Sequence, residues 1–240
     1  MMRAIPSPSP ATEPVFRRVF LAAILAGLVA GVLVTGLQAA RLKPLIAVAE
    51  KYEDAMPGHV ADEGWTPAPG QRTAYTLLAN LVIATGFGLL LSGGFALRQA
   101  FSGNEAGARE GLLWGLAGFA CFSLAPSFGL PPELPGSVAA GLAARQAWWL
   151  GTAAATAASI GLIAFARGWT WRVLAIALLA LPHILGAPQP SAEGGAVPAS
   201  LAAQFAAASL AIAALFWIVL GSVGGWLYER LGRAREAVRS

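Results

Sequence analysis

The 240-residue sequence has few charged residues: only 12% are Asp, Glu, Lys or Arg, whereas 57% are hydrophobic. A soluble domain carries about a quarter charged residues, so this composition lacks the polar surface that a soluble core of this size requires. The charges also come in clusters, separated by long stretches that have none. These absences argue against a soluble globule and indicate a chain whose solvent is lipid.

Residues that carry common chemistry are scarce. The single cysteine, Cys121, permits no intramolecular disulfide and no cage of several thiolates, and we interpret it as a buried, inert thiol. The two lysines, Lys43 and Lys51, do not follow a glycine as the lysine of a phosphate-binding loop does. No Gly-x-Ser-x-Gly and no paired-histidine motif occurs. We therefore expect no enzyme and no permanently bound cofactor.

Six apolar stretches are long enough, or nearly long enough, to cross a bilayer. A hydrocarbon core of about 30 Å needs roughly 20 residues of helix, and none of the stretches has a charged residue in its interior. We predict an all-α fold: a polytopic membrane helical bundle of about six transmembrane helices, or five because the third and fifth stretches are short. The predicted spans are 19–40, 76–97, 111–128, 147–166, 171–187 and 201–228.

The ends of the chain differ from the bundle. Ser and Pro alternate within residues 1–15, a pattern that cannot build a helix, so we expect a disordered cytoplasmic tail there. Residues 16–229 form the predicted bundle, with an acidic outer loop at 41–75, and residues 230–240 form a basic cytoplasmic tail.

Basic residues set the predicted orientation. With six spans, eleven of the sixteen Lys and Arg residues fall on the side that holds both termini, which assigns that side to the cytoplasm. These residues stand at the ends of apolar segments rather than in one patch, so we expect lipid and not nucleic acid as the partner. Glycines four residues apart (Gly27 and Gly31, Gly111 and Gly115, Gly221 and Gly225) predict close helix packing.

Polar side chains gather in the outer halves of the predicted spans. Polar groups in lipid must pair or face a wet cavity, so we expect an outward-facing polar vestibule. The alternative is that each group simply reaches interfacial water. The side chains are Gln38, Thr76, Asn80, Ser123, Arg145, Gln146, His183 and Gln204.

The first outer loop combines carboxylates with one imidazole: Glu50, Glu53, Asp54 and His59. Such ligands suit a divalent cation of intermediate hardness, such as Co²⁺, Ni²⁺, Mn²⁺ or Zn²⁺, although a solvated acidic loop is the alternative. If residues 47–54 continue as a helix, Glu50 shares a face with Glu53 or Asp54.

Two further candidate metal ligands lie in other outer segments. Glu133 stands in a loop that its prolines make stiff, and His183 follows the helix-breaking Pro182 near the end of a span. We expect Arg72 and Arg145 to pair with carboxylates and to set the geometry of these loops.

Six segments together carry a family resemblance: FRRVFLAAILAGLVAGVL, WTPAPGQRTAYTLLANL, GLLWGLAGFACFSLAPSFGLPPELPG, ARQAWWLGTA, LPHILGAPQP and ALFWIVLGSVGGWLYER. With them the chain, from about Phe16 to Tyr228, resembles the CbtA family, the proposed cobalt transporter subunit of bacteria.

The resemblance implies import of Co²⁺ for cobalamin synthesis across the bacterial inner membrane, together with CbtB, a small one-helix partner rich in histidine. Many family members are histidine-rich in the first outer loop, whereas this chain has only His59 there. Metal binding is then expected at Glu133 and His183 or on the partner. The alternatives are a non-transporting scaffold or assembly subunit, and a transporter of nickel or of a corrinoid.

Overall fold

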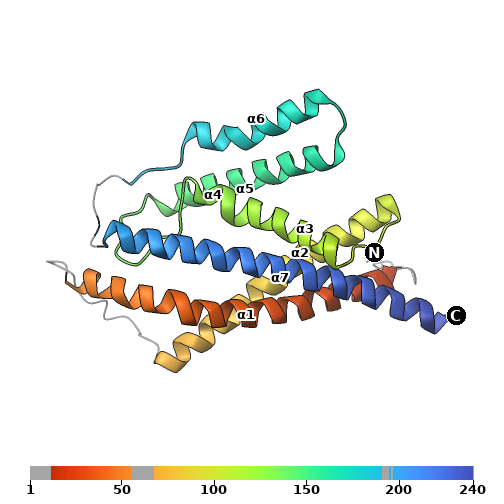
Figure 1. Cartoon of the computed structure of the whole chain (residues 1–240), viewed down its shortest axis with the longest axis horizontal. Helices are drawn as coiled ribbons and strands as arrows, with labels where there is room; N and C mark the ends of the chain where they lie inside the picture. The colour runs from red at the N-terminus through yellow and green to blue at the C-terminus, as the bar shows by residue number, and fades with distance from the viewer. Residues whose placement is uncertain (1–11, 56–67, 191–194, 196, 240) are drawn as a thin grey trace, which may run out of the picture. The chain divides into compact units, whose positions relative to one another are not determined.

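The computed structural model of the chain describes residues 12–55, 68–190, 195 and 197–239, and its regular elements in these ranges are all helices (Figure 1). The predicted all-α membrane bundle is confirmed. The elements are α1 (Thr12–Asp54), α2 (Pro69–Ser102), α3 (Ala108–Phe119), the π-helical turn η1 (Ala120–Leu124), α4 (Ala125–Ser127), α5 (Leu142–Phe165), α6 (Trp169–Leu185) and α7 (Ala199–Arg239).

Each of the six predicted spans lies on a helical segment of its own. Four helices, α1, α2, α5 and α7, are long and apolar enough to cross a membrane, and α6 is a shorter apolar helix. The third span consists of α3, η1 and α4, which follow one another without a break. The short third and fifth spans are therefore helices, as the six-span reading requires.

Three helices are much longer than a bilayer needs. α1 has 43 residues, α7 has 41 and α2 has 34, against the roughly 20 that cross the hydrocarbon core. The predicted loop at 41–75 is therefore wrong for residues 41–54, which belong to α1, and for residues 69–75, which belong to α2. The Ala, Leu, Lys and Glu residues in that stretch favour helix in water as well as in lipid. The prediction of a disordered tail is also wrong for residues 12–15, which form the start of α1.

The chain divides into two compact units, and each is described by itself. Unit 1 comprises Met1–Leu33, Ala74–Gly115 and Phe216–Ser240. Unit 2 comprises Val34–Thr73 and Leu116–Leu215.

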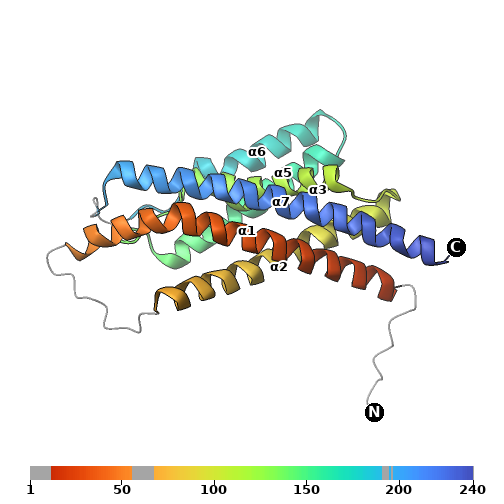
Figure 2. The ribbon, with the colours of Figure 1, turned by 60° about the horizontal axis from the view of Figure 1, so that its bottom comes forward.

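In unit 1, α1 packs closely against α2 (Figure 2). A Cβ atom on Gly27 would lie 2.8 Å from the Cα atom of Thr85, and one on Gly31 would lie 2.9 Å from the Leu81 side chain. Contact positions rise along α1 as they fall along α2, so the two helices are antiparallel. The expected role of this glycine pair in helix packing is confirmed.

The other two glycine pairs pack against each other in unit 1. A Cβ atom on Gly111 would collide with the carbonyl oxygen of Gly221, and one on Gly225 with that of Gly107. A Cβ atom on Gly115 would likewise strike the backbone of α7. α3 and α7 therefore meet backbone to backbone, which only glycine allows.

The two ends of the helical chain lie at the same end of unit 1. Gly232 of α7 contacts the Arg18 side chain of α1, and a Cβ atom on Gly224 would lie 3.7 Å from the Cβ atom of Ala26. α1 and α7 are therefore antiparallel, as an even number of crossings requires. This arrangement favours six spans over five.

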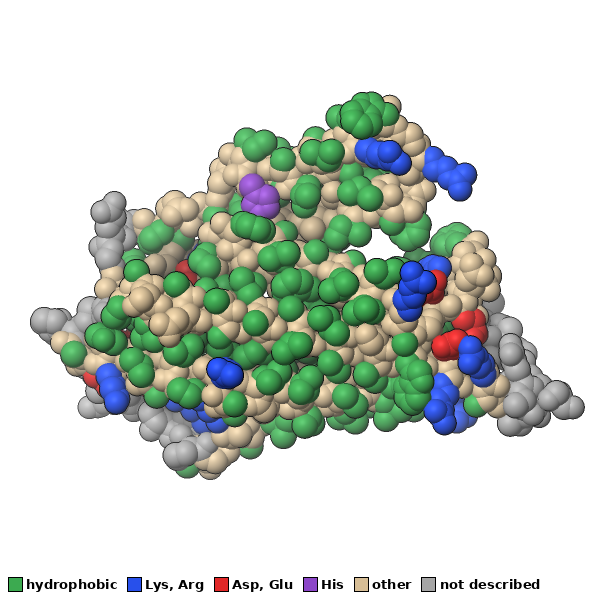
Figure 3. Space-filling model, in the orientation of Figure 1, with side chains coloured by type: hydrophobic (Ala, Val, Ile, Leu, Met, Phe, Trp, Pro, Cys, Tyr) green, Lys and Arg blue, Asp and Glu red, His purple; other side chains and the backbone are tan. Residues whose placement is uncertain are grey.

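In unit 2, α5 and α6 form a hairpin (Figure 1). Gly168 directly precedes α6 and has φ +113°, a backbone conformation that favours glycine. The buried Ser159 hydroxyl donates to the Ala175 carbonyl at 2.6 Å and ties the two helices together. Large apolar side chains of the hairpin remain exposed, such as Ile184 at 79%. Such a surface fits lipid better than water, and hydrophobic side chains also cover much of the face drawn in Figure 3.

Candidate functional site

The polar residues at the end of α1 are held by α2 within unit 2. Glu50 accepts a hydrogen bond at 3.0 Å from Arg72, and the Lys43 ammonium donates to the Thr73 hydroxyl at 2.7 Å. Because α1 is helical to Asp54, the condition set for Glu50 to share a face with its acidic neighbours is met. The predicted pairing of Arg72 with a carboxylate is confirmed.

The proline-rich segment that carries Glu133 turns at Gly136. The Ser137 N–H donates to the Leu134 carbonyl at 3.2 Å, and Gly136 has φ +75°, which a residue with a side chain rarely adopts. A Cβ atom on Gly136 would lie 3.3 Å from the Cβ atom of Glu53. The turn that follows Glu133 therefore rests against the acidic end of α1.

Arg145 joins this segment to the first turn of α5. Its guanidinium donates to the Glu133 carboxylate at 2.6 Å, and each side chain is 29% exposed. The predicted pairing of Arg145 with a carboxylate is thus confirmed as well. In this state the Glu133 charge is neutralised by an arginine rather than free.

His183 lies in the last turn of α6 among aromatic rings. Its ring centroid is 6.0 Å from those of both Phe128 and Trp148, in edge-to-face geometry. The Trp148 indole N–H donates to the Pro182 carbonyl at 3.2 Å, which fixes the end of α6 against α5. The His183 side chain itself is exposed. The α6 terminus thus presents an imidazole on a rigid aromatic base.

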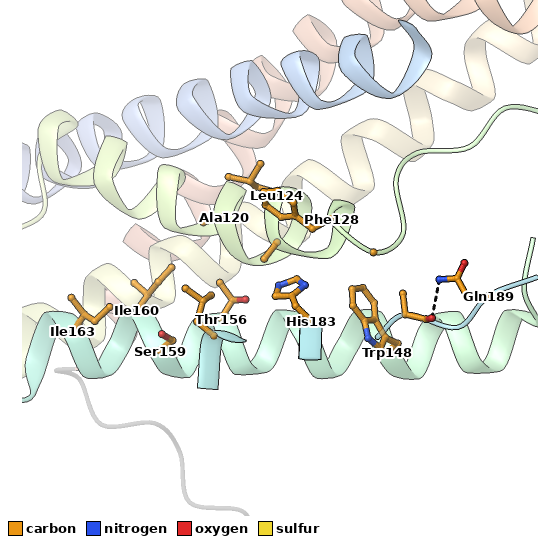
Figure 4. A pocket seen from close by; sticks show the side chains of 14 residues that line it. Ala120, Leu124, Phe128, Trp148, Thr156, Ser159, Ile160, Ile163, His183 and Gln189 are labelled. Carbon is orange, nitrogen blue, oxygen red and sulfur yellow. Dashed lines mark hydrogen bonds between the residues drawn. The ribbon is translucent and has the colours of Figure 1, made fainter. Parts of the chain in front are cut away.

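A cavity of about 770 Å³ lies beside this imidazole. Figure 4 shows its walls: Ala120, Leu124 and Phe128 on one side, and Thr156, Ser159, Ile160 and Trp148 of α5 on the other, with His183 pointing between them. The lining is mostly apolar, and its hydroxyls donate to backbone carbonyls, as Thr156 does to Thr152 at 2.8 Å.

The π-helical turn η1 forms part of the same wall. The Ala125 N–H donates to the Ala120 carbonyl, one residue further back than in an α-helix, and Pro126 follows with no N–H. Both features release backbone carbonyls from the helix ladder. The expected buried position of Cys121 in this turn is confirmed.

The structure brings only part of the predicted metal site together. Glu53, Glu133 and Arg145 belong to adjoining segments, whereas His59 lies outside the described residues. Among the residues that are described, no group of three or more His, Cys, Asp or Glu side chains is placed to hold a metal ion. Any metal site in the described chain would therefore need other ligands as well.

The predicted vestibule residues fall in both units. Gln38, Arg145, Gln146 and Gln204 belong to unit 2, and Asn80 belongs to unit 1. Gln146 and Gln204 are exposed, whereas Gln38, Asn80 and Arg145 are half-buried.

One polar cluster escaped the sequence analysis. Arg18, which served there only to set orientation, is buried in unit 1 with Gln99, Glu105 and Tyr228. The signal that the sequence offered for this cluster was Glu105, an acidic residue in the short link 103–107 between two predicted spans.

Long apolar helices with charged and polar ends are typical of a helical membrane protein. The chain belongs to the CbtA family, described as a probable cobalt transporter subunit, which it matches over residues 16–229. It is accordingly a transporter subunit and not an enzyme. No curated protein and no solved structure shows significant similarity to the chain.

Proposed function

We propose that this chain is the membrane-embedded subunit of a bacterial importer that admits Co²⁺ from the periplasm for cobalamin synthesis. Membership of the family supports cobalt as the cargo. The observation that carries the site is the meeting of three polar segments in unit 2: the α1 end with Glu53, the turn after Glu133, and the α5 start with Arg145.

The end of α1 would concentrate the cation. Glu50, Glu53 and Asp54 place negative charge on the last turns of one helix, and His59 follows them in the sequence. Carboxylates grouped on a surface raise the local concentration of cations. Co²⁺ accepts both carboxylate and imidazole ligands, which suits this set.

Glu133 and His183 would then coordinate the ion at the entrance. The Glu133–Arg145 pair is partly exposed, and such pairs contribute only about 0.2–1 kcal/mol, so a divalent ion can replace the guanidinium. Within unit 2, Gln38, Gln146 and Gln204 would offer amide groups to the partly hydrated ion along an outward-facing vestibule.

We place the protein in the inner membrane with both termini in the cytoplasm, as the basic residues indicate. The family description as a subunit supports a partner protein, for which we propose a small histidine-rich helix of the CbtB type. The three glycine pairs are occupied by helix contacts within unit 1. The partner would therefore dock elsewhere.

Uptake of radioactive cobalt tests the proposal, in cells that lack other cobalt importers and express the chain with and without the partner. Replacing Glu133 or His183 by Gln should lower uptake at least about tenfold, the scale on which changes at metal sites act. Glu110→Gln is the matched control, because Glu110 also pairs with an arginine but lies in unit 1. Wild-type uptake by both variants would refute the site, and competition by Ni²⁺ or a corrinoid would identify another cargo.

A second candidate function is a non-transporting assembly subunit. Glu50 and Glu133 both pair with arginines, which favours this candidate. Carboxylates in ion pairs can stabilise the fold without binding a metal ion. Purified chain that carries cobalt into liposomes without a partner would exclude this candidate.

A further inference from the structure

A single guanidinium connects separate segments of unit 1. The Arg18 Nε atom donates to the Tyr228 carbonyl at 2.5 Å, and Nη1 donates to Glu105 at 2.8 Å and to the Gln99 side chain at 3.3 Å. The guanidinium also lies over the Tyr228 ring, 3.7 Å from its centroid. We name Arg18, Gln99, Glu105 and Tyr228 the Arg18 cluster.

The cluster is closed on itself; Arg18 and Tyr228 are buried, whereas Gln99 and Glu105 are half-buried. The Tyr228 hydroxyl donates to the Gln99 amide oxygen at 2.8 Å, and the Gln99 amide N–H donates to Glu105 at 3.1 Å. Arg18 is 9% exposed and Tyr228 is fully buried. The four side chains come from the first turns of α1, the end of α2, the link that follows it, and α7.

The acidic member of the cluster stands on a non-helical link. Residues 103–107 connect α2 to α3, and the link begins at Gly103, with φ +71°. Backbone outside a helix has fewer internal hydrogen bonds to hold it. Arg18 ties this link to α1 through Glu105.

The energetics of the closed cluster are close to balanced. A buried ion pair gains little net stability, because the attraction of the two charges roughly offsets the loss of their hydration. Arg18 Nη2 is buried and has no acceptor among the residues that the structure describes. Exposure to water would satisfy this donor and hydrate both charges, so the open state of the cluster is accessible.

The other ion pairs of unit 1 that involve described residues do not reach α1. Arg98 pairs with Glu110 between α2 and α3, and Glu229 pairs with Arg233 within α7. Charged side chains gather at this end of unit 1, on the right of Figure 3. The Arg18 cluster is thus the polar connection between α1, the link and α7.

We propose that the Arg18 cluster is a latch that closes the terminal end of unit 1, and that the latch opens during transport. The inference rests on the proposed function as an importer. The charge distribution assigns this end to the cytoplasm, so the opening of the latch is the step that releases the ion inward. The contacts that break are those from Arg18 to Glu105 and to Tyr228.

A thiol probe reads the opening of the latch without any metal. Ala22 is fully buried one helical turn after Arg18, so Ala22→Cys in a Cys121→Ala background gives a single thiol that reacts only when the end opens. We expect Glu105→Gln to raise the rate of labelling by an impermeant maleimide about tenfold in inside-out vesicles, a change of about 1.4 kcal/mol. Glu110→Gln is the control and should leave the rate unchanged.

A disulfide lock separates a latch from a structural staple. A Cβ atom on Gly224 would lie 3.7 Å from the Cβ atom of Ala26, within the range that a disulfide spans. In the Cys121→Ala background, oxidised Ala26→Cys/Gly224→Cys protein should lose cobalt uptake at least tenfold and regain it on reduction. If the cluster only stabilised the structure, the disulfide would leave cobalt uptake unchanged. The variants Ala26→Cys and Gly224→Cys, made singly, show the effect of each substitution without the disulfide.

Each outcome decides the proposal. An unchanged labelling rate in Glu105→Gln would overturn the latch, and so would undiminished uptake by the locked protein. If Glu105→Gln does not fold, Arg18→Lys keeps the positive charge but loses the Nε donor to the Tyr228 carbonyl, and an unchanged labelling rate there would equally overturn the latch. If the protein without the disulfide takes up no cobalt, the proposed function as an importer fails. The maleimide labelling rate still tests the latch in that case, because it needs no cobalt.

Discussion

The guanidinium of Arg145 lies 2.6 Å from the carboxylate of Glu133 and joins the start of α5 to the proline-rich segment before it. Both side chains are 29% exposed, so water screens the pair. Screened pairs of this kind contribute about 0.2–1 kcal/mol. The arginine therefore restrains the carboxylate without binding it tightly, which leaves Glu133 available to a divalent ion.

Removal of the arginine should strengthen cobalt binding. In Arg145→Gln the cation no longer has to displace a guanidinium from Glu133, so we expect the half-saturating cobalt concentration for uptake to fall up to about fivefold, which corresponds to about 1 kcal/mol. Uptake is measured against cobalt concentration. Arg98→Gln, which breaks an ion pair in unit 1, is the control. If Arg145→Gln instead raised the half-saturating cobalt concentration as much as Glu133→Gln does, Arg145 would be needed to hold the site in place.

The sequence predicted the fold where lipid leaves few choices. A charge-free run of about 20 residues must be helical in a bilayer, because every backbone group needs a partner inside the segment. The glycine pairs Gly27–Gly31 and Gly221–Gly225 were correctly predicted as packing positions, because closely packed helices require small residues. Arg72 and Arg145 were correctly predicted to pair, because an arginine near a carboxylate rarely stays unpaired.

Other features depend on information that hydropathy does not contain. Hydropathy marks where a helix leaves the lipid and not where it ends, so the length of α1 beyond Ala40 was missed. The π-helical turn at Ala120–Leu124 depends on packing rather than on local propensity. The Arg18 cluster was missed because its members are far apart in sequence: Arg18 and Tyr228 are 210 positions apart. The metal site itself remains a prediction.

The contact between α3 and α7 should tolerate no side chain. A Cβ atom on Gly111 would meet the Gly221 carbonyl oxygen, so Gly111→Ala should lower the free energy of unfolding by about 1–3 kcal/mol, as overpacking does. Thermal unfolding in detergent or lipid nanodiscs measures the change. Gly86→Ala is the matched control: nothing lies within 4 Å of a Cβ atom there, so it should not destabilise. Equal losses in the two variants would contradict the close helix contact.

The hydrogen bond between α5 and α6 should stabilise the hairpin modestly. Ser159→Ala removes the donor to the Ala175 carbonyl and should cost about 0.6–1.7 kcal/mol, the range for hydrogen bonds between membrane helices. Thr156→Val is the control, because the Thr156 hydroxyl bonds within α5 and its loss should matter less. Unfolding in urea and mild detergent compares the two. A larger loss in Thr156→Val would show that the hairpin does not depend on this bond.

Trp148 should hold His183 in place through the end of α6. Trp148→Phe keeps an aromatic ring beside His183 but loses the N–H that donates to the Pro182 carbonyl at 3.2 Å, so we expect a loss of about 0.5–1.5 kcal/mol in stability. The looser helix end should also raise the reactivity of the imidazole toward diethyl pyrocarbonate. The chain has two histidines, so a His59→Gln background leaves His183 as the sole target. Trp169→Phe, at a side chain that is 75% exposed, should change neither quantity. If Trp148→Phe matched this control, the indole would not position His183, and the case for that imidazole as a cobalt ligand would lose its structural support.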